Sequence, residues 1–384
     1  MPVAPVDTAV DTLAPYLAAL EPVVADAVAP RAIEIDRTGS FPRDALDALA
    51  SAGLLGLVSA HEVGGQGEGL AAATAVVQEL ARHCGSTAMI VMMHYAATAL
   101  LEANGPLPVR ESIAAGDYLA TLAFSEVGSR SHFWAPVSSA TSVDGFVRLD
   151  ARKSWVTSAG EADGYVWSSR PMGTEGASTL WLVPADAAGL SVGAPFDGLG
   201  LRGNGSSPMT AEGVTVSAAA MLGPDGGGFD LMLGVVLPWF QVMSAGFSVG
   251  TADVATTTAA AHAAGTRLEH LDQALADNPV VRASVARMRI RTDAAEALLR
   301  DTIAAVESGR PDAMLRVLES KAAAGEAAAD VTDLAMRVCG GAAFRKEVGV
   351  ERNFRDARAA MVMAPTTDTL YDFIGRAVCG LPLF

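Results

Sequence analysis

Cysteine, aromatic residues and basic side chains are all scarce in this sequence of 384 residues. The three cysteines, Cys84, Cys339 and Cys379, lie far apart and form no C-x-x-C pair, so neither a disulfide framework nor a zinc site is indicated. We expect all three to be small buried residues. Lysine and arginine number 27 against 43 aspartates and glutamates, a net charge of −16, which argues against a nucleic-acid partner or an anionic membrane surface.

Targeting and membrane signals are also missing. Residues 1–17 lack the basic segment and long apolar core of a signal peptide. No run of 18 apolar residues occurs, so we expect no membrane span. The sequence therefore predicts a cytoplasmic protein.

Hydrophobic residues make up 51% of the sequence, and the abundance of alanine, leucine and valine favours helix. The apolar period is helical from about residue 10 to 120, with Leu70, Ala73, Val77 and Leu80 on one face. The glycine-rich segment 62–67 is expected to interrupt these helices, because glycine adopts backbone conformations that other residues avoid.

The period changes at about residue 120 and again at about 225. Between these points short segments rich in β-branched and aromatic residues predict strands, punctuated by glycine, aspartate and proline. We therefore predict an α+β fold with an N-terminal helical domain over 1–120 and a small β-barrel or β-sandwich domain over 121–225. A C-terminal four-helix bundle is expected over 226–384.

Four motifs follow one another on this layout. They are Thr121-Leu-Ala-Phe-Ser-Glu-Val-Gly-Ser-Arg-Ser-His132, Arg152-Lys-Ser-Trp-Val-Thr-Ser158, Gly198-Leu-Gly-Leu-Arg-Gly203 with Gly213-Val-Thr-Val-Ser217, and Cys339-Gly-Gly341 with Val350-Glu-Arg-Asn-Phe-Arg-Asp-Ala357. In order and rough spacing they resemble the flavin loop, the K-x-W-I-T-N strand, the G-x-R-G-S segment and the V-E-R-x-x-R-D-A stretch of acyl-CoA dehydrogenases. With the helical ends, this resemblance covers nearly the whole chain.

The resemblance implies an FAD-dependent oxidoreductase that forms a homodimer or homotetramer, since that family completes its FAD site across a subunit interface. An isoalloxazine ring is flat and largely apolar with a polar edge, so its site needs an aromatic wall and a few hydroxyl or backbone donors. By resemblance, Ser125 and Thr157 would donate to the ring, and Trp155 would pack against it beside Phe124. Ser131 would meet the pyrophosphate.

Further FAD contacts implied by the resemblance lie in the C-terminal half of the chain. They are Arg267, Gly340, Gly341, Thr366 and Asp368. Arg267 would reach the pyrophosphate of a neighbouring subunit, although His270 and Leu271 replace the Phe and Gly of the family pattern. Taken alone, Trp155 is better explained as a core residue and the glycine pair as a helix C-cap. The joint occurrence of the motifs favours flavin binding.

The catalytic carboxylate of the family is missing. Acyl-CoA dehydrogenases remove the weakly acidic α-proton of a thioester with a glutamate, which must lie within hydrogen-bond reach of that proton. Counting from the R-D-A motif places Ala364 at this position. A minority of the family carry the glutamate in the helix after the β-domain, where this sequence has Trp239. Neither side chain can accept a proton.

Several titratable residues are candidates for other roles. Glu126 is expected to receive backbone donors rather than to act in catalysis. His94 lies in an apolar helix and is expected to be a core histidine bonded to a backbone carbonyl. His132, where the family usually has Asp, could be structural or could act near the ring. Asp372 is a further candidate base, and Asp368 would reach the base position if the count shifted by four.

Three functions remain open. The first is an oxidoreductase of the acyl-CoA dehydrogenase type that acts on an acyl thioester or related substrate without the usual base, with an electron-transfer partner. The second is a group D flavin monooxygenase, which uses O2 and reduced FAD or FMN from a partner reductase. The third is a non-catalytic subunit paired with a homologue that carries the glutamate, although retention of Trp155 and Thr157 speaks against it.

Overall fold

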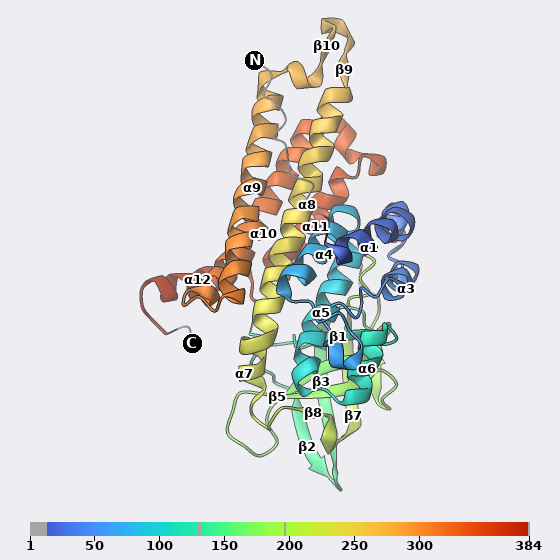
Figure 1. Cartoon of the computed structure of the whole chain (residues 1–384), viewed down its shortest axis with the longest axis vertical. Helices are drawn as coiled ribbons and strands as arrows, with labels where there is room; N and C mark the ends of the chain where they lie inside the picture. Colours follow the sequence, from blue (N-terminus) through green and yellow to red (C-terminus); the bar gives the residue numbers. More distant parts are fainter. Residues whose placement is uncertain (1–13, 130–131, 196, 383–384) are drawn as a thin grey trace.

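The computed structural model describes residues 14–129, 132–195 and 197–382. Helices form both ends of this chain and strands form its middle (Figure 1). Strands begin at Ala120, and helix returns at Gly228. The predicted α+β class, with helical, β and helical domains in that order, is therefore confirmed.

The N-terminal domain packs short helices around one long, central helix. α5 (Gly85–Asn104) is buried on nearly all sides, which is typical of a helix at the centre of a domain. In α4 (Leu70–His83) the predicted apolar face is buried. The remaining helices of this domain are α1 (Pro15–Val23), α2 (Ala32–Thr38), α3 (Arg43–Ser51) and α6 (Leu107–Ala115).

The predicted glycine break separates α3 from α4. Gly64 and Gly67 have φ angles of +92° and +64°, in the left-handed region that favours glycine. A short 3₁₀ turn, His61–Val63, lies within the break.

His94 is a core histidine, as predicted. Its ring lies 3.0 Å from the carbonyl oxygen of Leu55 through Nε2 and 3.2 Å from the backbone N–H of Ala120 through Nδ1. Burial lowers the pKa of this ring, so the neutral form is favoured. Both nitrogens are thereby used to join α5 to the neighbouring loop and to the first strand.

The β-domain consists of two four-stranded sheets, with strand orders β1-β4-β5-β8 and β2-β3-β7-β6. β1 and β4 run parallel, and the other pairs in both sheets are antiparallel. The longest strands, β3 and β7, each have 11 residues. The strands are β1 (Ala120–Ala123), β2 (Ser139–Val143), β3 (Phe146–Val156), β4 (Gly164–Ser169), β5 (Thr179–Pro184), β6 (Leu190–Val192), β7 (Ser207–Ser217) and β8 (Met221–Leu222).

The C-terminal domain is a bundle in which α8, α9, α10 and α11 pack together. Alanines line part of the contact between α8 and α10, which lets the two helices approach closely. A hairpin of β9 (Arg267–Leu268) and β10 (Gln273–Ala274) joins α8 to α9. The helices are α7 (Gly228–Leu231), α8 (Leu237–Gly265), α9 (Pro279–Glu307), α10 (Ala313–Cys339), α11 (Val350–Val362) and α12 (Thr367–Val378).

The helix over Gly228–Gly265 is long and apolar enough to cross a membrane by length and composition alone. In the fold, 72% of its most apolar window is buried inside the protein. The apolar sequence of this helix is therefore accounted for by its place in the core.

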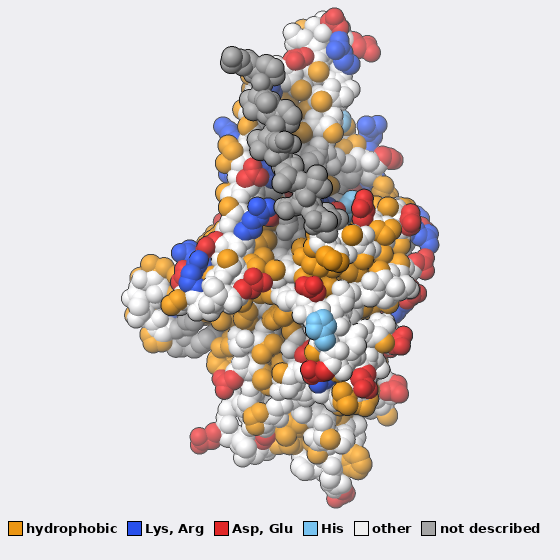
Figure 2. Space-filling view, in the orientation of Figure 1, with side chains coloured by type: hydrophobic (Ala, Val, Ile, Leu, Met, Phe, Trp, Pro, Cys, Tyr) orange, Lys and Arg blue, Asp and Glu red, His pale blue; other side chains and the backbone are white. Residues whose placement is uncertain are grey.

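The last helix differs from the rest of the bundle. α12 projects sideways (Figure 1), and hydrophobic side chains lie exposed around its base (Figure 2). Cys84 and Cys339 are buried, as predicted, but Cys379 is exposed just after α12. The prediction for Cys379 was wrong because the chain leaves the bundle before this residue.

The R-D-A motif ties the three domains together. Arg355 on α11 donates to both carboxylate oxygens of Asp36 on α2, at 2.8 and 2.6 Å, and to the carbonyl oxygen of Leu199 at 3.0 Å. The neighbouring Asp356 accepts the backbone N–H of Leu201 at 2.7 Å. These bonds fix the 198–206 loop of the β-domain against both helical domains, and part of this loop lines the cavity described next.

Candidate functional site

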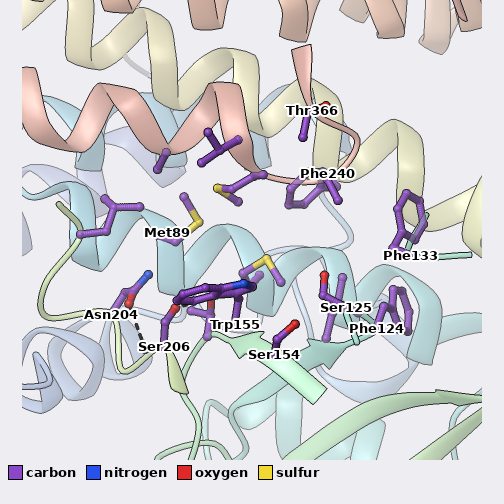
Figure 3. Close-up of a pocket in the computed structure, with 18 of the residues that line it drawn as sticks. Met89, Phe124, Ser125, Phe133, Ser154, Trp155, Asn204, Ser206, Phe240 and Thr366 are labelled. Carbon is purple, nitrogen blue, oxygen red and sulfur yellow. Dashed lines mark hydrogen bonds between the residues drawn. The ribbon is translucent and has the colours of Figure 1, made fainter. Parts of the chain in front are cut away.

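A cavity of about 830 Å³ lies at the junction of the three domains. Its walls come from α5, from β1 and the loop after it, from β3, from the 198–206 loop, from the start of α8, and from α11 and the loop that follows (Figure 3). This volume lies within the range of small-molecule and cofactor sites, roughly 300–1,000 Å³. Most of the lining side chains are apolar, with several hydroxyls among them.

Trp155 reaches this cavity because β3 is irregular at that point. The pairing of β3 with β7 skips register between Lys153 and Val156, and Trp155 has a φ of +56°, which is rare for a bulky residue. Such bulges redirect a side chain and are frequent beside functional sites. The indole is 60% exposed and faces the cavity (Figure 3). Trp155 is therefore a wall of the cavity rather than a core residue.

Hydroxyl and amide groups cluster around the same space. Ser125 follows β1, Thr157 follows β3, and Thr366 precedes α12, where its Oγ1 accepts the backbone N–H of Thr369 at 3.4 Å. Thr157 Oγ1 lies 3.5 Å from Ser206 Oγ. Five of the predicted cofactor contacts thus line one cavity. They are Phe124, Ser125, Trp155, Thr157 and Thr366.

Other predicted site residues do not line this cavity. These are His132, Arg267, Gly340, Gly341, Asp368 and Asp372. His132 is exposed and meets the ring of Trp134 edge-on, at 5.2 Å between centroids. Asp368 and Asp372 are exposed on α12. Their assigned roles stay predictions, and Ser131 lies outside the described residues.

Arg267 and the glycine pair are also exposed, away from the cavity walls. Arg267 lies on the β9–β10 hairpin, at the end of the bundle remote from the β-domain (Figure 1), where it pairs with Asp272. Gly340 and Gly341 follow the last residue of α10. Gly340 has a φ of +55°, which suits a chain leaving a helix. Within one subunit these residues cannot complete the cavity.

Both residues predicted at the base positions are apolar, and one of them lines the cavity. Ala364, in the loop between α11 and α12, lines it as the sequence count predicts. Trp239 does not line it and is instead packed against the core, whereas its neighbour Phe240 does line it. The assignment of Trp239 to the second base position therefore stays a prediction. The chemical consequence is unchanged, because neither ring can accept a proton.

Glu126 is the one acidic side chain among the described residues of the cavity wall. Its Oε1 accepts from Lys153 Nζ and from Ser138 Oγ, both at 2.5 Å. Its Oε2 accepts from the backbone N–H groups of Val137 at 2.6 Å and Ser138 at 2.9 Å. Burial alone would raise the pKa of Glu126, but Lys153 and these donors outweigh it and lower the pKa. The expectation that Glu126 receives backbone donors is confirmed.

Lys153 is the partner that sequence reasoning missed. Its side chain is fully buried, and Nζ also donates to the carbonyl oxygen of Ser168 at 2.7 Å and to its Oγ at 2.9 Å. Burial lowers the pKa of Lys153 to about 8, against the opposing attraction of Glu126. A signal was present, since Glu126 directly follows Ser125 and Lys153 lies two residues before Trp155, in separate motifs. Bridge pairing of the two residues brings them together.

The fold and this cavity define a three-domain protein with a mainly apolar site at the domain junction. Three models of the acyl-CoA dehydrogenase family match the chain: the N-terminal domain over 16–112, the middle domain over 121–214 and the C-terminal domain over 226–379. The chain therefore belongs to the acyl-CoA dehydrogenase family. Members of this family are FAD-binding oxidoreductases.

Individual relatives match over almost their full length. The cyclohex-1-ene-1-carbonyl-CoA dehydrogenase of Geobacter metallireducens is 28% identical over 367 residues, covering 91% of this chain and 93% of its own. The structure of butyryl-CoA dehydrogenase from Megasphaera elsdenii superposes with a TM-score of 0.89 at 21% identity, covering 95% and 97%. The prolyl acyl carrier protein oxidase AnaB superposes with a TM-score of 0.86 at 20% identity, covering 94% and 98%.

Proposed function

We propose that this chain binds FAD in the 830 Å³ cavity and acts as an oxidoreductase on an acyl thioester or a related substrate, without a carboxylate base. The observation that carries the proposal is the composition of the cavity wall. It unites the hydroxyls and the tryptophan expected of a flavin site, while its one described carboxylate is bound by four donors.

The cavity wall suits the flat ring of a flavin. Trp155 offers an aromatic surface, and Ser125 and Thr157 offer donors for the polar edge. Thr366 would contact the cofactor from the opposite wall, which the loop after α11 forms (Figure 3). Bound FAD supplies hydride or electron acceptance, and the protein supplies orientation and exclusion of water.

The missing base limits the reaction. A positioned general base contributes roughly 10²–10⁴-fold to the rate of proton transfer, and Ala364 and Trp239 supply none. We therefore infer a substrate that is already acidic at Cα, or a reaction in which no α-proton is removed. Saturated acyl-CoA compounds with no activating group are poor substrates on this account.

The acyl group of the substrate could be carried by CoA or by an acyl carrier protein. The Geobacter relative is named for a CoA thioester and the AnaB structure for an acyl carrier protein, so both carriers belong in a substrate screen. We infer an electron-transfer partner if the reaction is dehydrogenation.

We also infer a homodimer or a tetramer built from two dimers. Large apolar side chains are exposed on the C-terminal domain: Val280 at 71%, Ile290 at 67%, Phe344 at 82% and Val378 at 69%. Apolar groups of this size on one domain favour coverage by a second copy of the chain. A second subunit would also give the exposed Arg267 and the glycine pair a site to complete.

A flavin monooxygenase is the second candidate. The same absence of a usable carboxylate favours it, because oxygenation by reduced flavin requires no removal of an α-proton. Adding a flavin reductase, NADH and O2 to the protein separates the candidates. Oxygen incorporation into an added substrate supports the monooxygenase, whereas substrate-dependent anaerobic reduction of FAD supports the dehydrogenase.

Flavin titration tests the site itself. FAD added to flavin-free protein should be quenched in fluorescence as it binds, and Thr157→Val should weaken the affinity about tenfold, as expected for one lost hydrogen bond of ~1.4 kcal/mol. Ser191→Ala is the control, because Ser191 is an exposed hydroxyl of β6 away from the cavity wall. Absence of FAD binding by the unmodified protein would overturn the proposal.

A further inference from the structure

A second buried lysine lies behind the cavity wall. Lys321 on α10 is 1% exposed, and its Nζ donates to three backbone carbonyl oxygens. These belong to Ala360 at 3.1 Å, Met363 at 3.0 Å and Pro365 at 2.8 Å. An ammonium group has three N–H donors, so every one of them is used.

The three acceptors bracket the position at which most of the family carry the base. Ala360 is in the last turn of α11, where carbonyl groups have no partner within the helix and a cation is favourable. Met363 and Pro365 lie on either side of Ala364. The loop held in this way supplies Met363, Ala364 and Thr366 to the cavity wall.

The charge on Lys321 has no acidic partner nearby. Among the described residues, no carboxylate lies within ion-pair distance of its Nζ. Burial lowers the pKa of this lysine to about 7, which reflects the unfavourable removal of the ammonium from water. Lysine is almost never fully buried without a specific partner. In the described part of the chain, the partners of Lys321 are carbonyl groups of α11 and of the loop after it.

We propose that Lys321 is a positioning residue that fixes the loop over 363–366 and thereby sets where Ala364 and Thr366 stand in the cavity. The part that concerns Thr366 rests on the proposed FAD site, whereas the part that concerns the loop does not. Lys321 on α10 thus determines the geometry of the part of the cavity wall that the loop between α11 and α12 forms.

Lys321→Met tests this role, because methionine matches the length of the side chain and removes all three donors. The matched control is Thr332→Val, which removes a buried hydroxyl from the same helix. Thr332 Oγ1 donates only within α10, to Ala328 at 2.8 Å and Ala329 at 3.1 Å. Hydrogen exchange of FAD-loaded proteins, read by mass spectrometry, then compares the loop with the rest of the chain.

In Lys321→Met, amide exchange of peptides covering 361–370 should accelerate at least tenfold, while peptides from β3 and α4 keep their rates. Those loop amides include Thr369 and Leu370, which bond to Thr366. FAD should bind about tenfold more weakly, as expected for one displaced contact. Thr332→Val should leave both readouts within about twofold of the unmodified protein.

Two results would overturn the inference. One is unchanged exchange over 361–370 in Lys321→Met, and the other is an equal acceleration in every peptide, which indicates general loss of stability. If Lys321→Met does not fold, Lys321→Gln replaces it, because glutamine keeps two N–H donors. Amide exchange over 361–370 must then accelerate locally in Lys321→Gln. If the unmodified protein binds no FAD, the proposed function fails, but the exchange comparison still decides the role of Lys321.

Discussion

The buried pair of Glu126 and Lys153 should be a major support of the cavity, and a double-mutant cycle can measure it. Both side chains are fully buried, and Nζ lies 2.5 Å from Oε1. Removing one partner of a buried pair strands the other and typically destabilises a protein by about 3–5 kcal/mol. Lys153→Met leaves a carboxylate with three of its four donors and leaves Ser168 without its ammonium donor.

Glu126→Gln acts from the other side of the pair. An amide cannot accept at both ends, so its NH2 group would face either the ammonium of Lys153 or the two backbone N–H donors. We expect Lys153→Met and Glu126→Gln each to lower the free energy of unfolding by about 3 kcal/mol or more. The double variant should cost less than the sum, with a coupling energy of about 1–3 kcal/mol.

Urea unfolding at fixed protein and FAD concentrations is the assay, because bound ligand and assembly both shift the midpoint. Arg337→Met is the control, since Arg337 is 73% exposed in its pair with Asp333 and such pairs contribute at most about 1 kcal/mol. Single-variant losses below about 1 kcal/mol, or equal to that of the control, would refute the assignment of a buried structural pair.

Three further predictions follow from other contacts. Burial raises the pKa of Asp356 to about 6, so the native state holds the carboxyl proton more tightly than the unfolded state does. This protonation contributes to the free energy of unfolding below about pH 4, and the contribution is lost as pH rises to about 6. Asp356→Asn keeps an acceptor for the backbone N–H of Leu201 but cannot titrate. In urea unfolding measured from about pH 4 to 6, this variant should lose the dependence of the free energy of unfolding on pH that Asp356 causes, which is at most about 1.4 kcal/mol per pH unit. Phe133 lines both the main cavity and an apolar one of about 60 Å³. Phe133→Ala should therefore enlarge the space between them and lower the free energy of unfolding by about 3–5 kcal/mol in the same assay. Light scattering should give a dimer or tetramer at micromolar concentration, and a 39.3 kDa particle would contradict the inferred assembly.

The fold was largely predictable because its evidence is local. Changes of apolar period at about 120 and 225 locate the β-domain, and segments rich in β-branched and aromatic residues between them predict its strands. The identity of the cavity wall was only partly predictable. Resemblance brought Ser125 and Thr157 into one site, but the exposure of Trp155 depends on a bulge that composition does not reveal.

Other parts of the site depend on structure that sequence spacing does not contain. A π-helical turn, Met232–Val236, precedes α8 and widens the helical repeat, which changes the face that each later residue occupies. After this turn Phe240 lines the cavity and Trp239 does not, which a count of residues along the sequence does not reveal. Lys321 gave no signal either, because a lysine in a helix is expected on the surface and its acceptors are backbone carbonyls about 40 residues away.

The most direct test of the central claim is the anaerobic reduction of bound FAD by a saturated acyl-CoA, followed by the loss of flavin absorbance. Dithionite serves as the control that the flavin can be reduced. Ala364 and Trp239 are predicted at the base positions, and Glu126 is bound by its donors. The account therefore predicts reduction that is absent or roughly 10²–10⁴-fold slower than general-base catalysis would give. Rapid reduction by the unmodified protein would contradict it and would show that another residue removes the proton.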